Sequence, residues 1–542
     1  WVVAFTLPGL LFMRAFKTFL ILSHRYIGIP LSFMFVLWFV SGFFMIYTGG
    51  MPKVTPDMQI NGSEPVDFSA VKLSPAEAQE QAGYDAPAAT LRTVLGRPVY
   101  ELGDPGYSST FVFADDGQLM QPLSVEQSAE LASHFLDIPV EQFNFSETLE
   151  DHTDQWTFTV QRDLPLHKFS VDDGFGTEVY VSAENALVST YTTTQSRVLS
   201  WLGTIPHWLY FEGLRDNQPL WYRIVVWSSA LGCVSAVLGL ILGVTQFRKQ
   251  VKPFELKRAI PYRGLMRWHY ILGCLFGITT FTWVFSGLVS MEPWDWTNAN
   301  GVQLSSSALT GSELELQQFP ALNAVDWPQV SEYPVKQVDF RRVLGAQYLL
   351  ASFTPTTDTL GGKRDRLHQP YNINGQLQSQ SALVDPLSGR VQAGFDAAVL
   401  AAALDASITG ADITEYEVMN GYDDYFYSRG NQLPLPVMRV KFDDPNESWI
   451  YVDLNQGQPL SLVHKYSRVE RWLYSGLHSL DFAFWYSKRP LWDIGVLFLM
   501  TGGLATSMLG LYFGLRRLKA DVKALINKVS RKKNAQELPH VA

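Results

Sequence analysis

The sequence predicts an α-helical membrane protein with four transmembrane helices in two pseudo-symmetric halves, and with two large α+β inserts on one side of the membrane. Three observations predict this fold class. Four apolar stretches lie at about 18–47, 221–246, 268–291 and 491–515. Sequence patterns near these stretches occur twice, and the polar segments between them are long enough for separate domains. We therefore expect one structural unit that is used twice.

The four apolar stretches are long enough to be transmembrane helices. A helix rises about 1.5 Å per residue, so roughly 20 residues cross a hydrocarbon core of about 30 Å. Pro30 lies in the first stretch, and we expect it to kink the helix without ending it. Segment 1–13 is apolar but too short to span, and is expected to be a lead-in at the membrane interface, with no cleavable signal peptide.

Two histidine pairs emerge from the internal repeat. HRYIGIPLSFMFVLWFVSG begins at His24 and resembles HYILGCLFGITTFTWVFSG, which begins 245 residues later at His269. RVLSWLGTIPHWLYF resembles RVERWLYSGLHSLDF, and at that offset of 271 residues His207 matches His478. His24 and His269 lie near the ends of their helices at one face of the membrane. His207 and His478 precede helices that begin at the other face. Each pair therefore belongs to one side of the membrane.

The orientation follows from the positions of Lys and Arg, which concentrate on the cytoplasmic side of membrane proteins. Basic clusters precede the first stretch, fill the loop after the second and follow the fourth. Both termini are then cytoplasmic, and both inserts lie outside, which in a bacterium is the periplasm. The expected segments are a lead-in (1–13), helix 1 (14–47), insert 1 (48–200), an outer His segment with helix 2 (201–246), a cytoplasmic loop (247–267), helix 3 (268–291), insert 2 (292–467), an outer His segment with helix 4 (468–515) and a basic tail (516–542).

The sequence patterns of both inserts predict small α+β units. Ser74 is the expected N-cap of a helix, and a second helix is expected to start near Ser124. Alternating apolar residues flank turn sequences such as FADDGQL, VSAENAL, VDPLSGRV and VDLNQGQPL. The similar hairpin endings indicate two such units in each insert. Acidic residues outnumber basic ones in both inserts, and the whole chain has a net charge of −10. Nucleic acid is therefore not expected as a partner.

The paired histidines predict a cofactor. Two imidazoles that face each other on one side of a bilayer are what a six-coordinate, non-covalent haem requires. We therefore expect two haem b groups, one held by His24 and His269 and the other by His207 and His478. The competing interpretation is structural, because a single histidine at a membrane interface is more often a hydrogen-bonded helix-end residue than a ligand. The chain has no CxxCH motif, and its two cysteines lie in predicted helices, so covalent haem and iron–sulfur centres are not expected.

Four arginines are secondary candidates for binding haem propionates. Arg25 and Arg267 flank the inner histidine pair, and Arg197 and Arg468 each precede an outer histidine by ten residues. A guanidinium group binds a carboxylate through two hydrogen bonds. For Arg25 and Arg267 the competing explanation is the general preference for basic residues at cytoplasmic helix ends.

The chain resembles the PepSY-associated transmembrane-helix family. The resemblance lies in FLILSHRYIGIPLSFMFVLWFVSG and in YVDLNQGQPLSLVHKYSRVERWLYSGLHSLDF. It implies a bacterial inner-membrane protein with PepSY-like units in the periplasm. Some members of this family are di-haem b reductases of ferric siderophores. The resemblance thus implies an oxidoreductase that passes electrons to a periplasmic ferric siderophore or other ferric chelate and releases Fe(II).

The source of the electrons must be separate. No GxGxxG motif follows a strand, and the cytoplasmic loops are too short for a nucleotide domain, so we expect quinol or a cytosolic reductase as donor. Two alternatives remain at this point. The protein could be a periplasmic binding or regulatory module of the PepSY type without redox activity, or a haem shuttle to a partner enzyme. Membrane lipid is a partner in every case.

Overall fold

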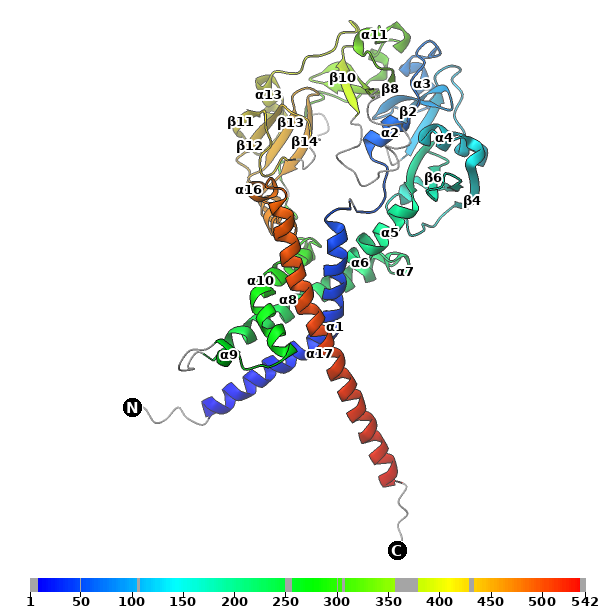
Figure 1. Ribbon diagram of the computed structural model, residues 1–542. Coiled ribbons are helices and arrows are strands. Elements are labelled where there is room, and N and C mark those ends of the chain that lie inside the picture. The colour runs from blue at the N-terminus through cyan, green and yellow to red at the C-terminus, as the bar shows by residue number, and fades with distance from the viewer. Residues whose placement is uncertain are drawn as a thin grey trace. The chain divides into compact units, whose positions relative to one another are not determined.

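The computed structural model describes residues 8–48, 50–104, 108–248, 256–299, 301–304, 308–355, 379–427 and 433–536. The chain forms two compact units, each built from segments that are far apart in the sequence. The first unit comprises Trp1–Thr48, Trp201–Thr297 and Val469–Ala542. The second comprises Gly49–Ser200 and Asn298–Arg468. Figure 1 labels many of the helices and strands of both.

Four long helices make up most of the first unit. They are α1 (Pro8–Met45), α8 (Gln218–Gln246), α10 (Leu265–Val289) and α17 (Leu491–Gln536). All four are long and apolar enough to cross a membrane, which confirms the four predicted spans. Large apolar side chains such as Trp227, Leu275 and Ile278 are more than 60% exposed on their outer faces. Such surfaces suit contact with lipid.

Helix α1 begins earlier than the predicted span. Residues 8–13 of the expected lead-in are already helical, and they continue without a break into the span. Pro30 lies inside the helix, where its ring removes one backbone hydrogen bond. The helix changes direction part-way along its length (Figure 1). A membrane helix tolerates such a proline because neighbouring helices cover the freed carbonyl.

Glycines bring the long helices close together at equivalent places. A Cβ atom at Gly503 of α17 would lie 2.2 Å from the ring of Phe39 on α1, and one at Gly232 of α8 would lie 2.8 Å from Val284 on α10. Gly232 and Gly503 are related by the 271-residue offset, and Phe39 and Val284 by the 245-residue offset. Only a residue without a side chain permits these approaches, as is common between membrane helices.

Short helices lead into α8 and α17. The first group is α6 (Thr204–Trp208) and α7 (Glu212–Arg215), and the second is the π-helix Trp472–Gly476, α15 (Leu477–Ser479) and α16 (Ala483–Tyr486). In each group the chain turns at a leucine whose backbone is in the left-handed region: Leu209 (φ 54°) in the first and Leu480 (φ 49°) in the second. A tryptophan of the following long helix fixes each turn: Trp221 donates its indole N–H to the carbonyl of Trp208 (2.9 Å), and Trp492 to that of Leu480 (3.1 Å).

The second unit contains a six-stranded antiparallel sheet to which both inserts contribute. The strand order is β10-β9-β8-β1-β2-β3. The bounds are β1 Ala89–Val94, β2 Arg97–Asp104, β3 Ser108–Phe113, β8 Val335–Val343, β9 Ala346–Phe353 and β10 Gln380–Val384. The inserts meet where β1 pairs with β8, with Leu91 opposite Val338. Helices α3 (Pro75–Ala82) and α11 (Trp327–Val330) accompany this sheet.

Each insert also forms a four-stranded sheet of its own. In the first insert the order is β4-β5-β6-β7, and in the second it is β11-β12-β13-β14. The bounds are β4 Phe143–Leu149, β5 Leu166–Val171, β6 Thr177–Ser182, β7 Leu187–Thr192, β11 Ile413–Met419, β12 Val437–Phe442, β13 Trp449–Asp453 and β14 Gln458–Val463. Helix α4 (Val125–Leu136) packs on the first sheet, and α13 (Ala397–Ser407) packs on the second.

The local predictions for the inserts hold, whereas the pairing between the inserts was missed. Ser74 and Ser124 both cap their helices through complete capping boxes. The turn sequences VSAENAL and VDLNQGQPL join β6 to β7 and β13 to β14. The other two turns close through single bridges, Val112 with Leu119 and Val384 with Val391. The chain enters and leaves this unit by α2 (Pro56–Gly62), α5 (Thr194–Leu202) and α14 (Lys465–Arg471).

Candidate functional site

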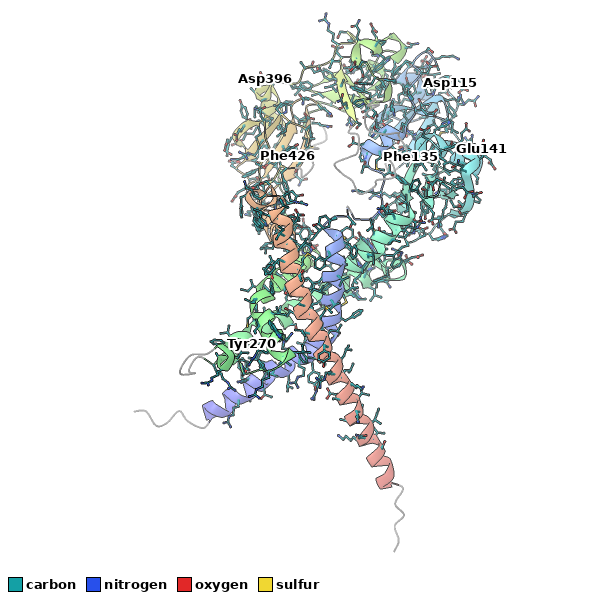
Figure 2. The ribbon with its side chains drawn as sticks, viewed as in Figure 1. Asp115, Phe135, Glu141, Tyr270, Asp396 and Phe426 are labelled. Carbon is teal, nitrogen blue, oxygen red and sulfur yellow. The ribbon has the colours of Figure 1, made fainter. Side chains whose placement is uncertain are left out.

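All four repeat-matched histidines lie in the helical unit. His24 is on α1, His269 on α10, His207 on α6 and His478 on α15. Each ring is half-buried. Tyr270, which follows His269, also lies among these helices (Figure 2) and donates its hydroxyl hydrogen to the carbonyl of Gly243 on α8.

The inner histidines, His24 and His269, are held by backbone carbonyls of the long helices. Nδ1 of His24 lies 3.0 Å from the carbonyl oxygen of Ser235 on α8. Nδ1 of His269 lies 3.2 Å from the carbonyl oxygen of Thr506 on α17. Ser235 and Thr506 are related by the 271-residue offset, so the two contacts are equivalent. The two imidazoles are near enough to each other for electrostatic interaction.

The outer histidines, His207 and His478, are held by serine hydroxyl groups. Nδ1 of His207 lies 3.0 Å from Oγ of Ser41 on α1, and Nδ1 of His478 lies 3.0 Å from Oγ of Ser286 on α10. Ser41 donates its own hydroxyl hydrogen to a carbonyl of its helix, that of Leu37 (2.7 Å) or Trp38 (3.1 Å). Ser286 donates in the same way to the carbonyl of Trp283 (2.9 Å). Both serines are fully buried.

These contacts determine the tautomer of each ring. A carbonyl oxygen only accepts hydrogen bonds, so Nδ1 of His24 and of His269 carries the hydrogen. The serine hydroxyl groups direct their hydrogens to carbonyls, so each Oγ accepts the Nδ1–H of its histidine. The Nε2 lone pair of every ring is then left to act as a ligand, which is the usual arrangement for a metal-binding imidazole.

The outer rings are spaced as two ligands of one metal. The ring centroids of His207 and His478 are 6.0 Å apart, with the ring planes at 77°. Two imidazoles that bind one metal from opposite sides, at metal–nitrogen distances of about 2.0 Å, have centroids roughly 6 Å apart. Burial and, as a smaller cause, the nearby His478 together lower the pKa of His207 to about 3. Burial also lowers the pKa of His478. Both rings are therefore neutral, as a metal ligand must be.

Glycines lie against all four rings. A Cβ atom at Gly239 of α8 would lie 2.9 Å from Cε1 of His24, and one at Gly510 of α17 would lie 3.6 Å from Cε1 of His269. A Cβ atom at Gly42 would lie 3.8 Å from Cε1 of His207, and one at Gly287 would lie 3.8 Å from Cε1 of His478. The backbone thus approaches each imidazole from the side. This close approach restricts the ring orientation in addition to the Nδ1 hydrogen bond.

Within the described residues, no hydrogen bond reaches the Nε2 atom of any of the four rings. The same part of the chain contains no group of three or more His, Cys, Asp or Glu side chains placed to hold a metal ion. Each pair therefore offers two protein ligands. The remaining coordination positions of a metal bound there would have to be filled by another group.

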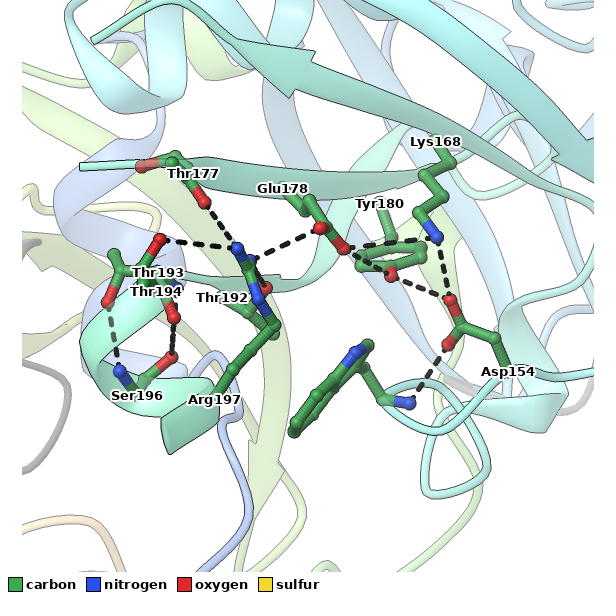
Figure 3. Close-up of polar contacts among 12 residues, drawn as sticks. Asp154, Lys168, Thr177, Glu178, Tyr180, Thr192, Thr193, Thr194, Ser196 and Arg197 are labelled. Atoms are coloured by element: carbon green, nitrogen blue, oxygen red, sulfur yellow. Dashed lines mark hydrogen bonds and ion pairs between the residues drawn. The ribbon is translucent and has the colours of Figure 1, made fainter. Parts of the chain in front are cut away.

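The four candidate arginines are not brought together. Arg25 is exposed on α1, and Arg267 donates through Nε to the carbonyl of Tyr262 (2.9 Å). Arg197 and Arg468 belong to the second unit. Arg197 pairs with Glu178 at 3.4 Å (Figure 3), and Arg468 pairs with Glu447 at 3.2 Å and lies 4.2 Å from the ring centre of Trp449. Their propionate role remains a prediction.

Several residues of this site were not assigned from the sequence. Ser41 and Ser286 lie in the repeated Ser-Gly dipeptide, and Trp221 and Trp492 are matched by the 271-residue offset. The internal repeat shows that these four residues are matched, but their function depends on which groups they contact in the folded protein. Arg471 was also missed. Its side chain and that of Asp481 are almost fully buried beside the segment of His478, and Nη2 of Arg471 donates to the Asp481 carbonyl at 3.0 Å.

The comparison with protein families agrees with this architecture. The PepSY-associated TM region matches residues 21–517, which include all four histidines.

The chain belongs to this family.

No curated protein matches the sequence. Membership of the PepSY-associated family, together with the four apolar helices, establishes that this is a membrane protein in contact with lipid.

Proposed function

We propose that the protein is a di-haem b electron-transfer protein of the bacterial inner membrane, which reduces a ferric siderophore or another ferric chelate in the periplasm. The arrangement of the four histidines carries this proposal. Each ring is fixed through Nδ1, each Nε2 is left as a ligand, and the equivalent contacts recur in both halves. A purely structural histidine would need neither the second fixed ring opposite it nor an unused Nε2.

The residues fit two haem groups. His24 and His269 would hold one iron, and His207 and His478 the other, in agreement with the 6.0 Å spacing of the outer rings. Two imidazoles leave four positions in an octahedron, which is the number that a porphyrin fills. The repeated contacts support two halves related by a pseudo-two-fold axis along the membrane normal, with one pair near each face.

A haem held by these histidines would supply one-electron redox chemistry when bound. The chain supplies the rest. Ser41 and Ser286 orient the outer imidazoles and set their tautomers, and the carbonyls of Ser235 and Thr506 do the same for the inner ones. The apolar helices around the rings exclude water and so favour transfer between fixed groups over side reactions.

The proposed orientation in the membrane gives electron transfer a direction, from the cytoplasmic side to the periplasm. The basic clusters support a cytoplasmic side for the inner pair and a periplasmic side for the inserts. A quinol or a cytosolic reductase gives up one electron and is oxidised, and one ferric complex in the periplasm takes it up and becomes ferrous. A chelator with anionic oxygen ligands holds Fe(II) less tightly than Fe(III), because the metal charge is lower. Release of the iron follows.

An optical spectrum of the purified protein, oxidised and dithionite-reduced, tests the proposal. We expect a low-spin b-type spectrum with close to two haems per chain by pyridine haemochrome. His24→Ala, His207→Ala, His269→Ala and His478→Ala should each lose about half of the haem. The matched control is His167→Ala, since His167 is also buried and has its Nδ1 2.8 Å from a serine hydroxyl group, that of Ser128. It should keep both haems.

Two results would redirect the interpretation. A folded protein without haem would contradict the proposal and favour a binding or regulatory function of the periplasmic unit. Full haem content without reduction of any ferric chelate would instead favour transfer to a partner enzyme.

A further inference from the structure

Helix α17 extends well beyond the rest of the helical unit. It is continuous from Leu491 to Gln536, whereas its repeat mate α8 ends at Gln246, a position equivalent to Arg517. The extension of about 19 residues corresponds to roughly 28 Å at 1.5 Å per residue. The end of α17 runs clear of the other helices of its unit (Figure 1). We refer to residues 515–530 as the extension helix.

The extension helix carries an uncovered apolar stripe. Its members follow one another at alternating intervals of three and four residues, which places them on one face of the helix. They are Leu515, Leu518, Val522, Leu525 and Val529, together with the adjacent Ile526. Their exposed fractions range from 47% to 62%. About 20 residues suffice to cross the hydrocarbon core, so in a span that begins at Leu491 this face lies beyond the membrane, where an apolar stripe is typical of a contact with another apolar surface.

Basic side chains surround the stripe. They are Arg516, Arg517, Lys519, Lys523 and Lys528. The single acidic residue in this segment, Asp521, pairs with Arg517 at 2.9 Å and accepts a hydrogen bond from Tyr26 at 3.3 Å. The surface around the stripe is therefore strongly positive, and it attracts a partner with an acidic rim.

Two other occupants fit less well. A second copy of this helix would bring the same basic residues together, and the stripe is only about two heptads long, which is short for a coiled coil. A membrane surface would require the helix to turn away from the direction of its span. The extension contains neither Pro nor Gly between Leu515 and Gln536, and the helix is unbroken there.

We propose that the extension helix is the docking site of a soluble, acidic electron-donor protein that covers the stripe with an apolar groove. This inference rests on the proposed electron-transfer function. Tyr26 lies two residues after His24, and its hydroxyl oxygen lies 3.4 Å from Nη2 of Arg517 as well as next to Asp521. The base of the extension helix is thus joined directly to the helix turn that carries an inner haem ligand.

Binding of two small acidic one-electron carriers, a flavodoxin and a [2Fe–2S] ferredoxin, tests the proposal. The full chain is placed in phosphatidylcholine nanodiscs, and the dissociation constant is measured by biolayer interferometry, so the readout does not depend on haem. We expect at least one carrier to bind. Lys523→Glu/Lys528→Glu and Val522→Gln/Leu525→Gln should each weaken binding at least tenfold. The matched control is Arg14→Glu/Lys17→Glu, two exposed positions on α1, and it should change binding less than twofold.

Three outcomes would overturn the proposal. The first is that neither carrier binds, and the second is that the control weakens binding as much as the extension variants do. The third is that the stripe variant alters only the oligomeric state, by light scattering, or only the affinity for vesicles with anionic lipid, which would identify a second copy or the membrane as the occupant. Haem content is measured in parallel, so loss of the proposed function and loss of docking are seen separately.

Discussion

At the scale of single residues, the inner and outer histidine pairs differ in what holds them. The inner rings donate to backbone carbonyls, which no substitution removes, whereas the outer rings donate to Ser41 and Ser286. A hydroxyl group that donates to a carbonyl becomes a better acceptor, so each serine is polarised toward its imidazole. The outer pair is therefore the one whose support can be changed by mutation.

Removal of either serine should weaken the outer site selectively. In Ser41→Ala or Ser286→Ala, one imidazole loses its Nδ1 acceptor and its fixed tautomer. Loss of such a partner typically costs about 10–100-fold in metal affinity. We expect the outer haem to be lost at least tenfold faster to apomyoglobin, while the inner haem is retained. The measurement is haem transfer followed by absorbance.

A matched control exists for this prediction. Ser507 is also a buried serine of the bundle, and among the described residues its hydroxyl group bonds only to the carbonyl of Gly503 in its own helix. Ser507→Ala should transfer haem at the wild-type rate. Equal rates for Ser41→Ala and the wild type would show that the hydroxyl group does not support the ligand.

At the scale of elements, the two four-stranded sheets carry equivalent polar clusters on the face opposite their helix. In the first sheet, Tyr180 donates to Asp154 (2.7 Å), and Lys168 pairs with the same carboxylate at 3.1 Å (Figure 3). In the second sheet, Tyr451 donates to Asp423 (2.9 Å), and Arg439 pairs with it at 2.8 Å. Each cluster joins neighbouring strands to a loop, and so stabilises the sheet beyond its backbone hydrogen bonds.

The first cluster makes the stability of its sheet depend on pH. Burial acts to raise the pKa of Asp154, but hydrogen bonds from Tyr180 and the Trp156 amide, with the charge of Lys168, hold it below its ordinary value. A lowered pKa in the folded state stabilises the protein above the unfolded pKa of about 4, and this contribution is lost as the pH falls through the folded value. Acidification should therefore lower the free energy of unfolding of this sheet.

Asp154→Asn isolates that contribution. The amide cannot pair with Lys168, so we expect the free energy of unfolding to fall by roughly 2 kcal/mol at pH 7. Once the pH falls below the folded-state pKa of Asp154, the variant and the wild type should converge. The measurement is urea unfolding of the full chain in detergent, followed by tryptophan fluorescence. Asp151→Asn is the control, because its side chain is 96% exposed. A constant difference at every pH would contradict the assigned cause.

At the scale of the whole molecule, the two inserts do not fold as separate domains. Strands β1 and β8 pair across the middle of the six-stranded sheet, and one hydrophobic core collects buried residues from both inserts. Thr90 of β1 donates to Asp339 of β8 at 2.8 Å in the same place. The second unit is therefore a single cooperative structure, although the 97 residues of Trp201–Thr297, which belong to the helical unit, separate its two segments in the sequence.

A charge placed in the shared core should affect both inserts together. Val338 of β8 is fully buried opposite Leu91 of β1. An unpaired buried carboxylate costs about 3–5 kcal/mol, so Val338→Asp should speed hydrogen exchange in β1–β3 as well as in β8–β10. Arg341→Asp changes an exposed residue of the same strand and should have little effect. Faster exchange confined to β8–β10 would mean that the inserts are independent.

Much of the fold could be predicted because its signals are local. Four apolar stretches gave the spans, since crossing a membrane requires length and composition and little else. Ser74 and Ser124 gave helix starts, and the turn sequences gave hairpins, because caps and turns depend on a few neighbouring residues. The β1–β8 pairing was missed. It joins residues that are almost 250 positions apart, and no local pattern encodes such a contact.

For the candidate site, the repeated sequence predicts the four histidines, whereas the contacts of each ring depend on how the helices pack. The internal repeat pointed to His24, His207, His269 and His478, because equivalent positions of its two copies carry the same residue type. Only the packed helices show that Ser41 and Ser286 hold the outer rings, and that Arg197 and Arg468 bind carboxylates of the second unit. Hydrogen bonds of this kind depend on distances of about 3 Å between distant segments. Such distances are set by packing and not by the order of residues.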